Sequence, residues 1–418
     1  MNSRNRLMRR RSLLQFGVTA GCLPMMQSTQ THASLNKPAN VQHIITIFLA
    51  GGLSQLDSFD PKPDSPSSVR GEFGSIQTAI AGVHFTEYLP KLAQNSADIA
   101  VLRGVSHSLV IHDAGEKFLL TGVKAFRPDT PSLGAIVSRW AEARTEVPVY
   151  AAIPSLSPNA GEFGQLHEPF NVLGDSGRLL KQGPDLDSPE QINQFERRVA
   201  LLNAVNVGMA ELKSAESLVG RQQAYETAQL ALMTRKLRTL TDLDQESAKT
   251  RETYGPGETG EYFLLARRLV EAGVRYVNVR LPGWDTHSDN FQQLRTLLPP
   301  VDIGLSALIQ DLKTRGLLSS TLVAVVTEFG RTPTVNSTLG RDHWPGTYSV
   351  LLAGGRVRGG QVFGETDTQA AEAVEGRCSP EDLAFTVLQE LGIQPNRTYV
   401  PPSGRVLLSE GRFLNELF

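Results

Sequence analysis

Cysteine is scarce in this 418-residue chain, which has two, Cys22 and Cys378. So few thiols exclude a disulfide framework and argue against a structural zinc site built on thiolates. Net charge is also nearly absent: 41 Lys and Arg residues face 43 Asp and Glu residues, giving a formal net charge of −2. This balance provides no overall field for nucleic acid or an anionic membrane, so we expect no nucleic-acid partner.

The chain also has no apolar run after its N-terminal region that is long enough to cross a bilayer. At the N-terminus, the arginines at 9–11 precede a short, weakly apolar stretch from Phe16 to Met26. Paired arginines before such a stretch indicate a twin-arginine export signal. We therefore expect residues 1–33 to be a signal peptide and the mature protein to be periplasmic or secreted. A lipid anchor at Cys22, within a distant lipid-box resemblance, is the alternative.

Buried strands and amphipathic helices alternate along the chain. Apolar runs bounded by glycine or proline, typical of parallel central strands, occur at His43–Ala50, Val274–Leu281, Thr321–Thr327 and Tyr348–Ala353. Helical patterns ending near glycine occur at Gly260–Ala272, Val301–Arg315 and Pro380–Leu391. The alternation predicts an α/β fold with a mostly parallel central sheet and helices on both faces.

One domain accounts for the mature chain, residues 34–418. Within it, residues 188–253 have almost no proline or glycine and are rich in Ala, Leu, Gln, Glu and Arg. This composition indicates a helical insertion beside the sheet, since no sustained heptad pattern supports a coiled coil.

Polar side chains follow the expected strands, and ligands of open α/β sheets bind beyond the carboxyl ends of strands. They are Asp57 and Asp60 after the first strand, Asp285 and His287 after the second, Glu328 and Arg331 after the third, and Arg341, Asp342 and His343 shortly beyond. Carboxylates with imidazoles form a ligand set for zinc, manganese or iron. The sequence therefore predicts a shared polar site with a metal ion at one edge of the sheet.

The spacing leaves several roles open. Asp285 and His287 are two apart, so both can point one way from an extended loop. Asp342 is either a ligand or a partner that orients the neighbouring His343. Arg331 and Arg341 suit a phosphate or sulfate group, because guanidinium forks match such anions.

Local structural roles compete with these assignments. Asp57 and Asp60 are also placed to cap the turn at Pro61. Glu328 is also placed to pair with Arg331.

A second histidine cluster precedes a predicted helix that begins near His112 and ends at Gly122. The N-terminus of this helix would favour an anion. His112 is a candidate ligand, nucleophile or general acid, with a simple capping role as the alternative.

Four motifs in order resemble an uncharacterised exported bacterial family, catalogued as domain of unknown function 1501. They are Gly-Gly-Leu-Ser-Gln-Leu-Asp-Ser-Phe-Asp-Pro-Lys-Pro at 51–63, Trp-Asp-Thr-His at 284–287, Thr-Glu-Phe-Gly-Arg-Thr-Pro at 327–333 and Gly-Arg-Asp-His-Trp at 340–344. That family is similar to sulfatases and to the alkaline-phosphatase-like superfamily. The resemblance covers nearly the whole mature chain.

The resemblance implies a two-metal site at the sheet edge and a nucleophile at a helix N-terminus. For this chain we expect one or two divalent ions (zinc, manganese or calcium). Asp285 and His287 match the Asp and His of one metal, and His343 is a candidate third ligand. Glu328 stands where sulfatases carry Asp-His for the other metal, and Asp57 matches the first-strand carboxylate.

Two departures from the sulfatase pattern bear on activity. Phe329 occupies the place of the histidine beside Glu328, and the nucleophile position falls on His112 without a Cys-x-Pro-x-Arg motif. We expect an exported metal-dependent hydrolase of a small anionic or carbohydrate-linked ester, a phosphate or a sulfate. In it, His112, Arg331 and Arg341 act at the reacting centre. The alternative is a catalytically silent fold that binds a ligand or a protein partner.

Overall fold

The computed structural model describes residues 40–418 except 125–126, 128, 142–146, 174–238 and 400–405. The expected signal peptide and most of the expected insertion at 188–253 lie outside these residues. No helix in the described part of the chain combines the length and the apolar character needed to cross a membrane.

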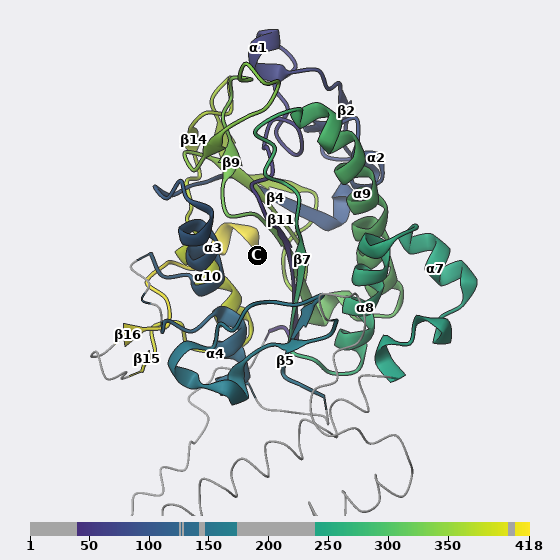
Figure 1. The fold of residues 1–418 in the computed structure, drawn as a ribbon, viewed down its shortest axis with the longest axis vertical. Coiled ribbons are helices and arrows are strands. Elements are labelled where there is room, and N and C mark those ends of the chain that lie inside the picture. The colour runs from purple at the N-terminus through teal and green to yellow at the C-terminus, as the bar shows by residue number, and fades with distance from the viewer. Residues whose placement is uncertain (1–39, 125–126, 128, 142–146, 174–238, 400–405) are drawn as a thin grey trace, which may run out of the picture. The chain divides into compact units, whose positions relative to one another are not determined.

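An eight-stranded, mostly parallel sheet forms the centre of the fold, as expected (Figure 1). Its strand order is β12-β4-β11-β8-β1-β7-β5-β6. The strands are β1 (His43–Leu49), β4 (Ile99–Val105), β5 (Tyr150–Ile153), β6 (Phe170–Asn171), β7 (Tyr276–Leu281), β8 (Thr321–Val326), β11 (Tyr348–Gly354) and β12 (Gln361–Phe363). β1 is central and pairs in parallel with both β7 and β8, so the chain segments after these three strands leave the sheet at the same edge.

The strand β11 runs antiparallel to its neighbours β8 and β4, although its apolar sequence is typical of a parallel strand. Its burial is as expected, but its direction is not. β8 and β11 are joined by a connection that contains the hairpin of β9 (Gly330–Arg331) and β10 (His343–Trp344) and no crossover helix. The chain therefore re-enters the sheet from the edge at which it left.

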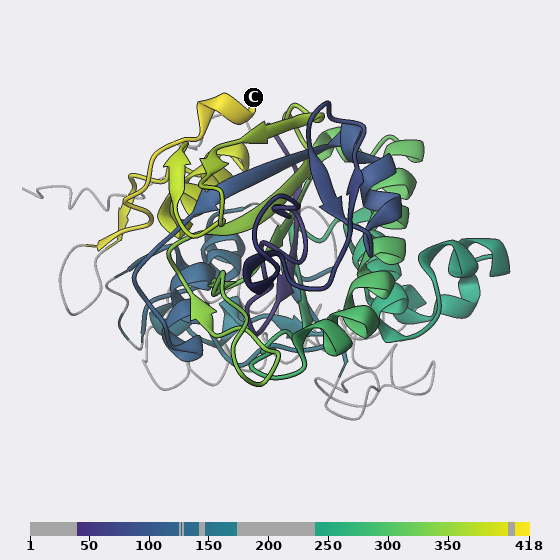
Figure 2. The same cartoon turned by 90° about the horizontal axis from the view of Figure 1, so that it is seen from above.

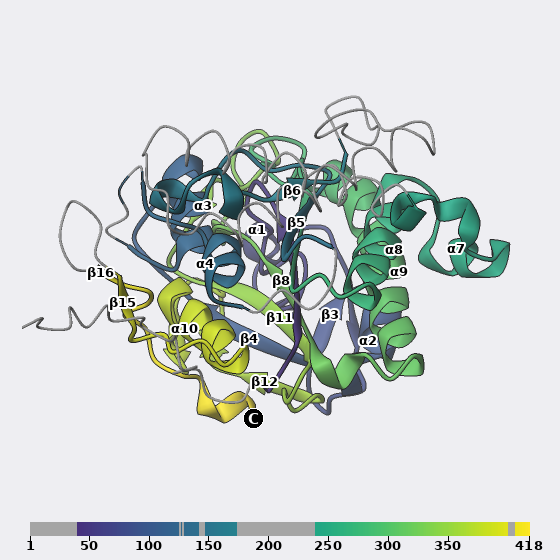
Figure 3. The same ribbon diagram turned by 90° about the horizontal axis from the view of Figure 1, so that it is seen from below.

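Helices cover both faces of the sheet (Figures 1 and 3). One face carries α3 (His112–Thr121), α4 (Leu133–Trp140) and α10 (Pro380–Glu390), and the other carries α2 (Pro90–Gln94), α7 (Ala248–Tyr254), α8 (Glu258–Glu271) and α9 (Asn290–Thr314). Alternation along β1 supplies both cores: Ile45 and Ile47 pack in the larger core, while Ile44 and Phe48 pack in the other.

Short elements complete the described fold. They are α1 (Ser67–Arg70), β2 (Ser75–Gln77), β3 (His84–Thr86), β13 (Glu365–Thr366), β14 (Ala373–Glu375), β15 (Thr398–Tyr399) and β16 (Val406–Leu407).

The helices predicted at Gly260–Ala272 and Pro380–Leu391 are confirmed as α8 and α10, but α9 begins eleven residues before the expected Val301. It contains Pro299 and Pro300, which remove two backbone donors and normally end a helix. Buried apolar side chains continue on both sides of the prolines: Phe291, Leu294, Leu298, Val301, Leu305 and Leu308. Burial of this stripe holds the helix together across the two prolines.

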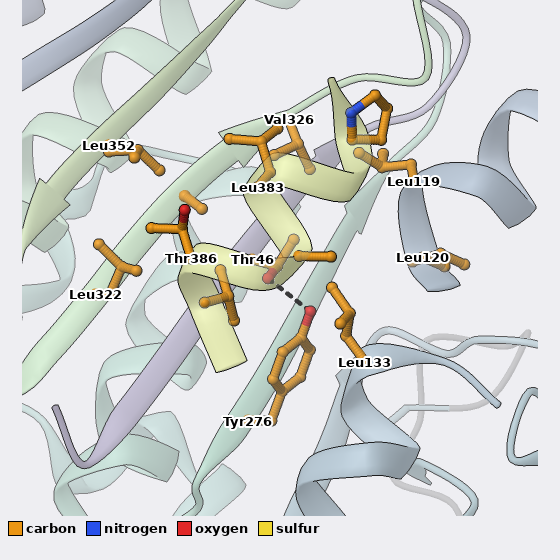
Figure 4. Close-up of a pocket in the computed structure, with 14 residues that line it drawn as sticks. Thr46, Leu119, Leu120, Leu133, Tyr276, Leu322, Val326, Leu352, Leu383 and Thr386 are labelled. Atoms are coloured by element: carbon orange, nitrogen blue, oxygen red, sulfur yellow. Dashed lines mark hydrogen bonds between the residues drawn. The ribbon is translucent and has the colours of Figure 1, made fainter. Parts of the chain in front are cut away.

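A small, mostly apolar cavity lies between the sheet and the helices α3, α4 and α10 (Figure 4). Thr46 and Tyr276 line it, and the Thr46 hydroxyl donates to the Tyr276 hydroxyl at 3.0 Å. Leu119, Leu133 and Val326 are also in its wall. The cavity is thus covered by the helical layer, and it contains none of the carboxylates or imidazoles expected at the sheet edge.

Arg267 of α8 is the centre of an ion network that joins α8, α9 and the segment before α7. Its side chain is 1% exposed, and its guanidinium lies 2.6 Å from Glu271, 2.8 Å from Glu246 and 3.0 Å from Asp311. Three carboxylates around one buried guanidinium offset the cost of removing its charge from water.

We expect Arg267→Met to lower the free energy of unfolding by about 2 kcal/mol, because the three carboxylates lose their buried cation and keep only the more exposed Arg268 and Arg315. Urea denaturation measures the change. Arg251→Ala is the matched control, since Arg251 pairs with Asp244 at the surface and such pairs contribute about 0.5 kcal/mol. Equal effects of the two substitutions would show that the network stabilises the fold no more than a surface ion pair does.

Candidate metal centre

The segments that follow β1, β7 and β8 meet at one edge of the sheet, together with the β9–β10 hairpin. Figure 2 shows the loop after β1, in dark purple, beside the green segments. Gly51 makes the close approach possible: its φ is +125°, and a Cβ there would lie 2.4 Å from the backbone nitrogen of Asp285. Only glycine tolerates both conditions.

Arg331 joins these segments from beneath. Its side chain is fully buried, and it donates to the backbone carbonyls of Gly52 at 2.9 Å, Arg341 at 3.0 Å and Trp284 at 3.2 Å, and also to that of Gly51. Because all three of its nitrogens donate to protein oxygens, the guanidinium connects the loops to one another. The structure does not present it to a substrate anion.

The same guanidinium fixes the charge of Asp285. Arg331 Nη2 lies 2.6 Å from Asp285 Oδ1. Burial favours the neutral carboxyl, but the hydrogen bond and charge of Arg331 outweigh it and lower the pKa of Asp285 to about 2. Asp285 is therefore an anion at neutral pH, and its side chain remains 48% exposed.

Three imidazoles surround this carboxylate. Asp285 Oδ2 lies 3.2 Å from His112 Nε2, and Oδ1 lies 3.1 Å from His287 Nε2 and 3.3 Å from His343 Nε2. The two nitrogens His287 Nε2 and His343 Nε2 are 2.9 Å apart. The side chains come from α3, from the segment after β7 and from β10, so distant parts of the chain form one cluster.

The Nδ1 atom of each imidazole lies within hydrogen-bond distance of an oxygen acceptor. The partners are Glu328 Oε1 for His112 at 2.7 Å, Asp342 Oδ1 for His287 at 2.8 Å, and the carbonyl oxygen of Val110 for His343 at 2.7 Å. These contacts assign the hydrogen to Nδ1, which leaves the lone pair of each neutral ring on Nε2. Three lone pairs and a carboxylate thus converge, an arrangement typical of metal centres whose histidines are oriented from behind.

The donor set fits a divalent cation. His112 Nε2 is buried and has no hydrogen-bond partner, while His287 Nε2 and His343 Nε2 lie 2.9 Å apart. Donor atoms of His112, Asp285 and His343 all lie within 4.8 Å of one another. A cation between them would give the orphaned nitrogen a partner.

The pKa values of two of the histidines shift in opposite directions. The hydrogen bond that His112 donates to Glu328 is the main cause that raises the pKa of His112, against the effect of burial. Burial is the main cause that lowers the pKa of His343, which favours its neutral, ligating form.

Glu328 and Phe329 occupy the region in which the resemblance to sulfatases implies a second metal. Glu328 is 2% exposed and accepts from the Gly51 amide at 2.8 Å as well as from His112. Phe329 is fully buried, with its ring centroid 4.9 Å from that of His112 and 4.4 Å from that of His343. Glu328 therefore stands behind a ligand, and an aromatic ring fills the neighbouring space.

Asp57 and Arg341 lie together below the cluster. Both are fully buried, with Arg341 Nε 2.8 Å from Asp57 Oδ2 and Nη2 3.1 Å from Oδ1. Asn290 donates to Asp57 at 3.0 Å, and Arg341 also donates to the carbonyls of Val69 and Thr332. The structure thus does not bring Asp57 into the set of candidate ligands, and Arg341 has no free edge for an anion.

Asp60 and His112 do not have the capping roles that were considered as alternatives. Asp60 is buried and pairs with Lys62 at 3.1 Å and with Arg103 at 3.0 Å. His112 is the first residue of α3, whose N-cap is Ile111 with no side-chain cap bond. The helix start therefore places the imidazole at the cluster.

Sequence reasoning missed one group, the carbonyl of Val110, because a backbone atom leaves no signal in residue type. It left the role of Asp342 open, and the contact to His287 assigns it an orienting role toward that ring rather than toward His343.

Fold and site together define an α/β protein with a candidate mononuclear metal centre at the carboxyl edge of its sheet. The chain belongs to the family described as "Protein of unknown function (DUF1501)", whose model matches residues 41–418. A comparison with curated proteins gave no match.

Solved structures similar to this chain include hydrolases. The PsFucS1 sulfatase from Pseudoalteromonas sp. is 12% identical, with a TM-score of 0.39 over 84% of this chain and 68% of its own. The phosphonate monoester hydrolase SpPMH from Silicibacter pomeroyi is 12% identical, with a TM-score of 0.37 over 89% of this chain and 76% of its own. The C-terminal periplasmic domain of EcEptC from Escherichia coli, in complex with Zn, is 9% identical, with a TM-score of 0.39 over 91% and 97%.

Substitutions at Asp57 and His287 should separate structural support from metal binding. Asp57→Asn should lower the free energy of unfolding of the metal-free protein by about 3 kcal/mol, because Arg341 stays buried without its counter-ion. His287→Ala should change it by about 0.5 kcal/mol or less, since His287 is 45% exposed, yet weaken metal binding. Urea denaturation in chelator and metal titration measure the two effects. Loss of metal binding in folded Asp57→Asn would restore Asp57 as a ligand.

Proposed function

We propose that this protein is an exported metal-dependent hydrolase of a phosphate or sulfate ester, with one divalent ion held by His112, Asp285, His287 and His343. The observation that carries the proposal is the convergence of three Nε2 atoms on an anionic carboxylate. The cluster lies at the sheet edge and is partly open to solvent, so a substrate can reach it.

A divalent ion at this cluster would supply Lewis acidity toward an ester oxygen or a water molecule. Side chains of the protein orient and charge the candidate ligands in advance. Glu328 and Asp342 hold the imidazoles of His112 and His287 in one tautomer, and Arg331 keeps Asp285 ionised. Phe329 packs against the rings of His112 and His343.

Ligand chemistry narrows the range of metals. Three imidazoles and one carboxylate suit zinc or manganese, and calcium prefers oxygen ligands. We assign one ion to this cluster, because Phe329 packs against His112 and His343 and Glu328 is held by the Gly51 amide and His112.

The same features support a second candidate, a metal-containing binding protein without turnover. Arg331 and Arg341 use their donors within the protein, and His112 is a candidate ligand rather than a free nucleophile. In this reading the open face of the cluster binds an anionic group without cleaving it.

Metal analysis of the mature protein, purified after native export, should give about one zinc or manganese ion per chain. His287→Ala should lower the stoichiometry at equal protein concentration, and Asp342→Ala should weaken the affinity by about tenfold, because the imidazole loses its orienting partner. Asp244→Asn, at an exposed ion pair, is the control and should change neither. A folded, metal-free wild-type protein would reject both candidate functions, and two ions would reject the single-ion centre.

Turnover separates the hydrolase from the binding protein. We expect the metal-loaded protein to cleave at least one member of a panel of aryl phosphate monoesters, diesters and sulfates. His343→Ala should lower kcat/KM by about 100-fold or more, because it removes a ligand. Normal metal content without turnover of any ester would favour the binding protein instead.

A further inference from the structure

Large apolar side chains are exposed around the candidate metal centre. The described residues include five such exposed side chains: Val110 at 53%, Ile111 at 66%, Leu166 at 49%, Leu339 at 55% and Val374 at 63%. Single exposed apolar residues are ordinary on proteins, so exposure alone identifies nothing. Three of the five, however, belong to segments that hold the cluster.

Val110 and Ile111 adjoin the centre directly. The carbonyl of Val110 accepts from His343 Nδ1 at 2.7 Å, and Ile111 immediately precedes His112 at the start of α3. Their backbone positions are therefore fixed by the candidate ligands themselves.

Leu339 adjoins the centre from another loop. Its neighbour Gly340 packs so closely on His287 that a Cβ would lie 2.0 Å from the His287 carbonyl oxygen. Its other neighbour, Thr338, donates to the same oxygen at 2.9 Å. The backbone of Leu339 is left-handed, with φ +57°.

That conformation makes leucine an unfavourable choice at position 339. Leucine pays steric strain in the left-handed region, where glycine and asparagine are tolerated, and here its side chain is also in water. Strained residues cluster at functional sites, because the surrounding structure must hold them in place. The left-handed backbone at Leu339 thus costs the protein stability, and its exposed side chain leaves apolar area that an apolar group would cover.

Charge at the centre is consistent with an apolar contact. The two arginines that follow the third strand, Arg331 and Arg341, are buried and donate to protein oxygens. Neither is available to bind a charged group on the remainder of a substrate.

We propose that the substrate is an amphiphilic ester, whose alkyl group packs on Val110, Ile111 and Leu339 while its anionic ester group lies at the metal centre. This inference rests on the proposed hydrolase function. We call these three side chains the apolar rim.

Alkylphosphonates test the rim, because their P–C bond resists hydrolysis and they differ in chain length alone. Titration calorimetry would compare methylphosphonate with octylphosphonate on the zinc-loaded mature protein, below the micelle concentration. Each buried methylene raises affinity about fourfold, so contact of even two methylenes predicts that octylphosphonate binds about tenfold tighter or more.

Three variants identify the surface responsible. Ile111→Ser and Leu339→Gly should bring the two affinities to within about threefold, at unchanged zinc content. Leu339→Gly should also raise the melting temperature, because glycine relieves the left-handed strain, so its lost preference is not a folding defect. Leu166→Ser, in η3 (Gln165–His167) beside α4, is the control and should keep the full preference.

The outcomes separate this inference from the proposed function. Equal binding of both phosphonates to the wild-type protein overturns the apolar rim but leaves the metal centre standing. A preference for octylphosphonate that survives in Ile111→Ser and Leu339→Gly also overturns it. Binding of neither phosphonate to zinc-loaded protein overturns the rim and the anionic-ester function together.

Discussion

One buried cation organises the edge of the sheet. Arg331 donates to the backbone carbonyls of the segments after β1 and β7 and of the β9–β10 hairpin, and it pairs with Asp285. A guanidinium suits this task because its five donors lie in one plane and stay charged when buried. The contact that fixes the loops also keeps Asp285 ionised, so the geometry of the centre and its charge have a common origin.

A second layer of support follows from this arrangement. Each candidate imidazole has a partner behind it, supplied by Glu328, Asp342 or the carbonyl of Val110. Such partners leave little freedom for ring rotation and set the tautomer that a metal requires. Phe329 packs against two of the rings, in the region where a sulfatase-like arrangement would have a second ion. The described residues thus form one candidate metal centre at the sheet edge, with an aromatic ring packed beside its imidazoles.

The fold was largely predictable from local pattern. Buried strands at β1, β7, β8 and β11 follow from short apolar runs bounded by glycine or proline, and α8 and α10 follow from their apolar stripes. Other features escaped, among them the strands β4, β5, β6 and β12, which were not among the predicted strands. The direction of β11 depends on the route of the chain between strands, and the start of α9 depends on packing that overrides Pro299 and Pro300. Both are set by contacts distant in sequence, which no local window contains.

Sequence by itself determined the chemistry available at the sheet edge: carboxylates, imidazoles and guanidiniums follow successive strands, and parallel strands bring such segments together. Tertiary structure alone decided which of them face solvent. Asp285, His287 and His343 lie at the open cluster, whereas Arg331, Arg341 and Asp57 are buried beneath it as structural ion pairs. The physical reason for this division is how deeply each side chain is buried. Residue spacing along one loop indicates which way its side chains point. The burial of a charged group, however, depends on how several loops pack together at the sheet edge.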